Sequence, residues 1–283
     1  MSLVTDQVLF FPNRTVNDDP AAAIEQADGS TGFRRGAVGT HTSRTIMLAE
    51  LSALFDAVPA TATTADVAGA IKASNILGKS TTSTRRLTNQ RLTELYALDP
   101  QVILYRILRR LWQIDVAGRP LLAILCAIAR DPLLAASASA VAPLANDAEF
   151  LRSPMKEAIR ADVDDRLNDS ILDKVVRNAA SSWTQSGHLV GRTIKKRSKV
   201  KATAGATALA LYLAHAAGFR GQQIFTSGWA KLLDADAAAL RNLALDAKRA
   251  GLIDLRIAGE VLDISFARLD LGKNTQPTPP GDA

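Results

Sequence analysis

The stretch Ala73–Leu98, ASNILGKSTTSTRRLTNQRLTELYAL, decides between two interpretations of this chain. Its first half satisfies the loose form of a phosphate-binding loop, with Ala73 in place of the usual first glycine and Gly78-Lys79-Ser80 at its end. Its second half predicts a helix whose exposed positions carry Ser, Thr, Asn, Gln and Arg. The first interpretation makes the chain a nucleotide-hydrolysing enzyme, and the second makes it a DNA-binding protein.

A phosphate-binding loop requires a buried strand before it and glycines that let backbone N–H groups approach the phosphates. The preceding residues Thr64–Ser74 instead carry apolar side chains at helical spacing, and Ser74–Leu77 contains no glycine. The sequence also lacks an apolar strand ending in aspartate and the common patterns of catalytic serine, cysteine and zinc sites. We therefore expect a non-enzymatic protein with no cofactor and no metal, in which Gly78-Lys79-Ser80 leads into the next helix.

The sequence predicts three short helices, two that begin before this stretch and one within it. Apolar residues recur at helical spacing from Ile46 to Phe55, from Thr64 to Ile76 and from Thr82 to Ala97. Short helices with tight connections, the last of them polar and basic on its outer side, are typical of a helix-turn-helix. We predict such a domain over residues 43–98, after a flexible extension over residues 1–42.

Residues 99–190 predict a helical middle domain. Pro120–Ala129 is apolar on all sides, which indicates a central buried helix. The helix before it carries Arg106, Arg109 and Arg110 together on its polar side. Their spacing leaves two uses open, a solvated face or contact with phosphates.

The most specific fold signal lies in residues 203–271. The pattern predicts three helices and then two strands, at Thr203–Ala217, Gln222–Leu233, Asp236–Ala250, Leu252–Ile257 and Val261–Phe266. This is the element order of a winged helix, and the Pro-rich residues 272–283 predict a disordered tail. The predicted fold class is therefore mainly α, with an N-terminal helix-turn-helix-like domain, a helical middle and a C-terminal winged helix with a short β-hairpin.

The net positive charge is concentrated in one segment. The chain of 283 residues carries a net charge of +6, and six of the ten residues Arg192–Lys201 are basic. An excess of positive charge favours an anionic partner such as nucleic acid. We predict a basic linker over residues 191–202 that lies along a phosphate backbone, with a solvated loop as the alternative.

These patterns predict which residues contact duplex DNA. Arginine can read guanine, asparagine or glutamine can read adenine, and serine or threonine hydroxyls bind phosphate. The third helix of the predicted winged helix has no net charge, so a protein partner is the alternative there. The expected DNA-binding residues are Lys79, Ser83, Arg85, Arg86, Asn89 and Arg91 around the polar helix, and Arg192, Lys195, Lys196, Arg197, Lys199 and Lys201 in the linker.

Other features indicate a cytoplasmic protein that does not enter a membrane. The single cysteine, Cys126, lies in an apolar run and is expected to be a small buried side chain. Residues 1–30 contain no recognisable secretory signal. Ala202–Phe219 lacks charged residues, but its Ala, Thr and Gly content and its central His215 predict a buried helix rather than a membrane span.

The motif Asn75-Ile76-Leu77-Gly78-Lys79, followed by Ser/Thr-Arg-Arg and then by Arg91–Leu98, resembles the BrxA family, the small helical component of BREX phage-defence systems. The later run Gln185–Lys196, followed by a helical unit that ends in a short hairpin, is also similar. The resemblance covers Ser43–Phe266 in the order of elements, and the extension before it is longer than expected for the family. It implies a non-enzymatic protein that binds double-stranded DNA beside a methyltransferase, an ATPase and other BREX factors.

The prediction is thus a non-enzymatic, double-stranded DNA-binding component of a bacterial anti-phage system. Two alternatives stay open. One is a scaffold or adaptor that binds partner proteins through its winged helix, and the other is a transcriptional regulator.

Overall fold

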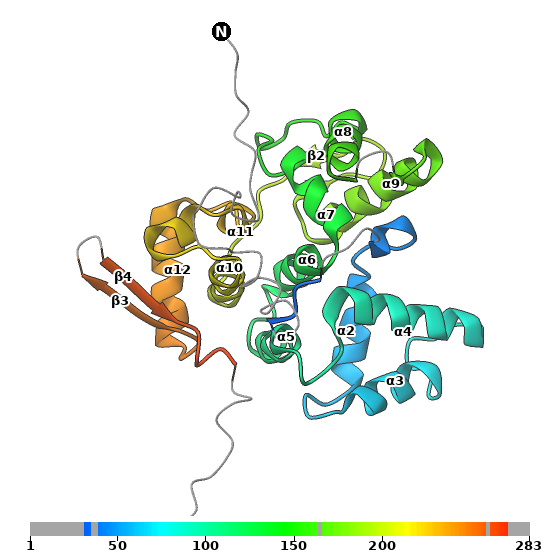
Figure 1. The fold of residues 1–283 in the computed structure, drawn as a ribbon, viewed down its shortest axis with the longest axis horizontal. Helices are drawn as coiled ribbons and strands as arrows, with labels where there is room; N and C mark the ends of the chain where they lie inside the picture. Colours follow the sequence, from blue (N-terminus) through cyan, green and yellow to red (C-terminus); the bar gives the residue numbers. More distant parts are fainter. Residues whose placement is uncertain (1–30, 35–38, 164–165, 259–260, 271–283) are drawn as a thin grey trace, which may run out of the picture.

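The computed structural model describes residues 31–34, 39–163, 166–258 and 261–270. The fold is mainly helical, as predicted, and its strands form two small antiparallel sheets (Figure 1). The predicted tail over residues 272–283 and most of the predicted extension lie outside the described residues. In the described part of that extension, Phe33 packs edge-on against Trp229, and Thr40 and His41 of the 3-10 helix η1 (Thr40–Thr42) are buried.

Three helices predicted around the opening stretch are present: α2 (Leu48–Ala57), α3 (Thr64–Lys72) and α4 (Thr82–Tyr96). Threonine side chains begin the last two, because Thr63 accepts from Asp66 N–H and Thr81 from Thr84 N–H. The connection from α3 to α4, residues 73–81, is nine residues long. It is longer than the three- or four-residue turn of a helix-turn-helix.

The middle of the chain is built around α6 (Arg119–Arg130), which lies at the centre of the molecule in Figure 1. Every residue from 121 to 129 is buried, Cys126 included, which confirms the predicted central helix. Helices α5 (Ile103–Ile114), α7 (Pro132–Ser137) and α9 (Asp169–Gln185) pack against it, and η2 (Ala138–Ala140) and α8 (Arg152–Val163) form a further layer beside α7.

A small sheet follows α9. Strands β1 (Leu189–Val190) and β2 (Lys196–Arg197) pair antiparallel, and Glu149 bridges to Lys196 on the other edge of β2. The segment predicted as a basic linker therefore contains one strand of a folded hairpin.

The last unit has the predicted order of helices and hairpin. It consists of α10 (Ala204–Ala216), η4 (Gly221–Thr226), α11 (Gly228–Lys231), α12 (Ala237–Arg249) and the paired strands β3 (Asp254–Ala258) and β4 (Val261–Ser265). The single helix predicted over Gln222–Leu233 is wrong. The backbone is extended at Ser227, whose side chain accepts from Ala230 N–H and starts a new helix there.

Buried side chains from Phe33 to Leu269 form one continuous cluster, so the predicted units share a core. Arginines of α5 hold these units together. Arg109 is buried against the Phe55 ring and donates to the carbonyls of Phe55 and Val58. Arg106 makes a bidentate pair with Asp270, at 2.7 and 2.6 Å. These arginines therefore join elements, a use that neither a solvated face nor phosphate contact anticipates.

Within the described ranges, no single helix is long and apolar enough to cross a membrane. In this described part of the chain, only α6 together with residues 132–140 reaches that length and apolarity, and the two are bent by 113° at the break between them.

Candidate nucleic-acid interface

The outer face of α4 is polar and open to solvent. Ser83, Arg86 and Gln90 are exposed and lie at i, i+3 and i+7, so their side chains leave the helix on one side. The opposite side of the helix is buried through Thr88, Leu92 and residues 95–96. Asn89, also expected at this site, is partly buried at the edge of the exposed face.

Three of the basic residues predicted for this site hold the local structure together. Lys79 Nζ lies 2.9 Å from Glu50 Oε1 on α2, and both side chains are about a quarter exposed. Arg85 reaches back over the connection and donates to the carbonyls of Lys79 and Lys72. These two side chains therefore support the start of α4, and their freedom to reach an anion is reduced.

The third of them, Arg91, pairs with Glu94 one turn further along α4, at 2.7 Å. Burial raises the pKa of Glu94, but hydrogen bonds from Arg91, Thr40 and Gln90 outweigh it, so the pKa lies below its ordinary value. Glu94 is thus held as a carboxylate, which keeps Arg91 engaged.

The connection before α4 is not a phosphate cradle. It follows a helix, and several of its amides are already bonded within the protein: Ile76 N–H to Ala70 O, Gly78 N–H to Asn75 O, and Lys79 N–H to Asn75 Oδ1. Asn75 adopts a left-handed conformation, with φ of 50°, and this ends the run of helical residues after α3. The stretch that resembles a nucleotide site is therefore the capped entry to α4.

The α3–α4 region carries excess positive charge. Between residues 64 and 96 there are five basic and two acidic side chains. In the part of the chain that the structure describes, the Arg86 guanidinium makes no ion pair or hydrogen bond to protein. An exposed arginine on a polar helix face, with further positive charge around it, is chemically suited to a phosphate or a guanine edge.

The basic segment over residues 192–201 is only partly available to a partner. Arg192, Lys196, Lys199 and Lys201 are exposed, whereas Lys195 Nζ donates to Thr184 Oγ1 at 2.7 Å. Figure 1 shows β2 beside α8, with α6 and α7 between it and the α3–α4 region. The two predicted groups of basic residues therefore do not make one compact patch.

Arg197 corrects the predicted site, because it is 2% exposed and cannot reach a phosphate. Its guanidinium pairs with the Asp234 carboxylate and donates to the carbonyls of Val141 and Ser198. Five hydrogen-bond donors in a planar group make arginine able to satisfy several acceptors at once in such an interior position.

A groove on the C-terminal unit runs between α12 and the β3–β4 hairpin. Its lining contains three cations and two carboxylates and consists of Lys248, Asp254, Leu255, Arg256, Asp263, Ser265 and Arg268. Arg268 already pairs with Asp254 at 2.9 Å. This mixed charge gives the groove no preference for a polyanion, in line with the neutral third helix predicted from the sequence.

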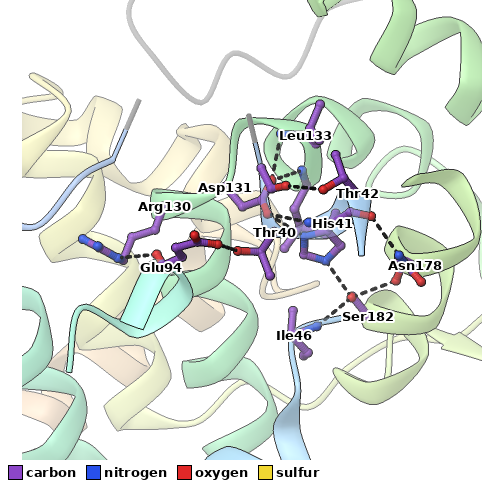
Figure 2. A network of polar contacts seen from close by, with 12 residues as sticks. Thr40, His41, Thr42, Ile46, Glu94, Arg130, Asp131, Leu133, Asn178 and Ser182 are labelled. Carbon is purple, nitrogen blue, oxygen red and sulfur yellow. Dashed lines mark hydrogen bonds and ion pairs between the residues drawn. The ribbon is translucent and has the colours of Figure 1, made fainter. Parts of the chain in front are cut away.

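A buried polar network joins η1 to the core, and sequence patterns did not reveal it (Figure 2). His41 lies between Asp131 and Ser182, with Nδ1 2.8 Å from Asp131 Oδ2 and Nε2 2.8 Å from Ser182 Oγ. Burial raises the pKa of Asp131, but the charge and hydrogen bonds of His41 outweigh it and hold that pKa low. Asp131 also accepts from Leu133 and Leu134 N–H at the start of α7.

This arrangement has the residue types of a hydrolytic triad, but its environment differs. His41, Asp131 and Ser182 are each 0% exposed, and Ser182 Oγ also accepts from Ile46 N–H and donates to Asn178 O. No substrate carbonyl can approach an oxygen enclosed in this way. The network instead fixes η1 against α7 and α9.

The same network reaches the end of α4. Thr40 Oγ1 donates to Glu94 Oε2 at 2.8 Å, and Arg130 Nε donates to the Glu94 carbonyl at 2.9 Å (Figure 2). The helix that presents Arg86 is therefore held at both ends, by η1 and α6 at one and by Arg85 at the other.

Among the described residues, no group of three or more His, Cys, Asp or Glu side chains is placed to hold a metal ion. Comparison of this chain with family models, with curated proteins and with solved structures finds no match.

Proposed function

We propose that this protein binds double-stranded DNA and that α4 is the element that faces the duplex. The observation that carries the proposal is the exposed Ser83–Arg86–Gln90 face, on a helix held at both ends. Arg86 would contact a phosphate or a guanine edge, and Ser83 a phosphate near the helix start. The positive end of the α4 dipole would add to the attraction of an anion, with the Thr84 amide already capped by Thr81.

The fold supports this proposal at the level of element order. Helices α2, α3 and α4 would form a helix-turn-helix-like unit with a long connection, and residues 204–265 a winged-helix-like unit. The mixed charge of the α12 groove favours α4 over α12 as the DNA-facing helix. Binding would be mainly electrostatic, without catalysis by the chain itself.

The resemblance of Asn75–Leu98 to the BrxA family supports the same activity. On that resemblance, we propose that the chain works in an anti-phage defence system of the BREX type, beside other proteins of that system. DNA binding by the isolated chain is the part of this proposal that is tested first.

The test is a fluorescence anisotropy titration of the purified chain against a labelled mixed-sequence duplex of about 20 base pairs. We expect binding at low salt whose affinity falls linearly on a log–log plot as salt is raised, because neutralised phosphates release counterions. Absence of binding at low salt would contradict the proposal.

A further inference from the structure

The small sheet around β1 and β2 presents a second face to solvent, the hairpin face, which consists of Glu149, Leu151, Val190, Arg192, Ile194 and Lys196. The pairs Val190–Lys196 and Glu149–Lys196 place β1 and the segment around Glu149 on the two sides of β2. Continuing the second register by two residues sets Leu151 opposite Ile194, since Phe150 N–H bonds to the Lys195 carbonyl between them. The strand pattern turns Val190 and Lys196 outward, and the other four residues are exposed beside them in the chain or across the bonds just named.

The hairpin face is unusually apolar for a surface. Leu151 is 56% exposed, Val190 46% and Ile194 61%. Among the described residues, the only other large apolar side chains with comparable exposure are Ile114, the last residue of α5, and Val116 in the turn after it. Clustered exposed apolar residues, unlike isolated ones, mark interaction sites.

Positive charge surrounds this apolar cluster. Arg192, Lys196 and Arg152 are exposed, against two exposed acidic side chains, Asp147 and Glu149. Burial, and to a lesser extent the nearby Arg152 charge, lower the pKa of Lys195. A partner for this face therefore needs negative charge as well as apolar side chains.

Contacts on the inner side of the sheet fix the hairpin face in place. The side chains of Leu189 and Arg197 point inward and are buried, and Arg197 is paired with Asp234. Lys195 Nζ closes the loop by bonding to Thr184 Oγ1 and to the Gly191 carbonyl. The apolar side chains cannot turn into the core, and a partner would lose little free energy in ordering them.

We propose that the hairpin face docks an acidic, amphipathic segment of a partner protein. We choose this partner because its carboxylates would complement the positive charge around the face. A DNA backbone would use the cations but gain nothing from Leu151, Val190 and Ile194, whereas a strand or helix with carboxylates beside apolar side chains uses both. The surface is separate from the α4 face.

The probe is a fluorescein-labelled synthetic peptide of alternating glutamate and leucine. Two control peptides replace every leucine by serine or every glutamate by lysine. We expect the first peptide to bind about tenfold more tightly than either control, because it alone supplies charge and apolar contact together. Equal affinity for the glutamate–serine peptide would overturn the proposal, since binding would then be electrostatic alone.

Variants locate the site. Ile194→Glu should weaken binding of the glutamate–leucine peptide about tenfold, while Ile114→Glu, at an equally exposed position in the other apolar cluster, leaves it unchanged. Arg86→Ala should also leave it unchanged, which separates this proposal from DNA binding. Equal peptide binding by Ile194→Glu and the parent chain contradicts it. The proposal is also contradicted if Ile194→Glu leaves peptide affinity unchanged but weakens binding to duplex DNA or to vesicles that contain phosphatidylglycerol.

Discussion

Basic residues of this protein fall into two kinds that the sequence does not separate. Arg197 is enclosed by carbonyls and one carboxylate, whereas Arg192, five residues earlier, is exposed. A guanidinium can replace its hydration only where several acceptors converge, and Asp234 and Val141 supply them from other parts of the chain. Counting positive charges therefore overstates what the segment over residues 192–201 can offer to an anion.

Replacing Arg197 by methionine should lower the free energy of unfolding by about 3–5 kcal/mol. The change leaves the Asp234 carboxylate buried without a cation. Urea unfolding followed by circular dichroism measures it, with Arg192→Met as the matched control, which should stay within about 0.5 kcal/mol of the parent chain. Equal stabilities for the two variants would show that the ion pair is not needed.

A buried histidine should make stability depend on pH. Burial lowers the pKa of His188 to about 4 from its ordinary 6.5, and Nε2 lies 2.8 Å from the Leu232 carbonyl. As pH falls below 6.5 the unfolded chain takes up a proton that the folded chain does not, so stability is lost between pH 6.5 and 4. From pH 7.5 to 5.0 the expected loss is about 2 kcal/mol.

Urea unfolding at these two pH values measures the loss. His188→Gln serves as the comparison, because it removes the titrating group while keeping a polar side chain. An equal pH dependence in the variant and the parent chain would refute the role assigned to His188.

For single residues, the sequence predicts which side chains face solvent better than it predicts which side chains form ion pairs. The spacing on α4 correctly predicts that Ser83 and Arg86 face solvent. It does not predict that Lys79 meets Glu50, or that Arg106 meets Asp270, because these pairs lie far apart in the chain. Local periodicity contains no information about such contacts, so they require the tertiary structure.

Secondary-structure elements were mostly predictable where apolar spacing and a capping residue agree. Helix α4 begins and ends close to its predicted limits because Thr81 caps it and its inner side is regularly apolar. The predictions fail at η4–α11 and at β1–β2. There Ser227 interrupts an apolar run, and strands of two residues are too short to show alternation.

Two helical glycines should respond in opposite ways to alanine. In α3, a Cβ at Gly69 would meet nothing within 4 Å, so Gly69→Ala should stabilise the protein by about 0.5–1 kcal/mol through helix propensity. In α10, a Cβ at Gly205 would collide with the Asp115 carboxylate, which accepts from Thr203 Oγ1 and Ala206 N–H. Gly205→Ala should therefore destabilise, by about 1–3 kcal/mol.

Thermal unfolding of both variants tests this contrast. The expected signs are a raised Tm for Gly69→Ala and a lowered Tm for Gly205→Ala. A raised Tm for both would mean that Asp115 moves aside without loss of its hydrogen bonds.

On the scale of the whole molecule, one core carries two separate outward faces. The α4 face is polar and basic, and the hairpin face is apolar with a basic edge. Figure 1 shows α6 and α7 between them. A rigid body of this kind is suited to holding a duplex and a second partner at a set separation. The DNA-binding hypothesis and the scaffold hypothesis would then both apply to the same protein.

The central claim is that duplex DNA meets α4 through Arg86. Replacing Arg85, Arg86 and Arg91 together would confuse binding with folding, because Arg85 and Arg91 hold the helix. Arg86→Ala alone is the sharper variant, and Arg249→Ala on α12 removes an exposed arginine elsewhere, one that pairs with Asp246.

The decisive measurement is the duplex-DNA affinity of these two variants and the parent chain across a salt series. For Arg86→Ala, we predict at least about fivefold weaker binding at low salt and a log–log salt slope smaller in magnitude by about 0.9, one phosphate contact fewer. Arg249→Ala should match the parent chain in both. If both variants bind alike, α4 does not face the DNA.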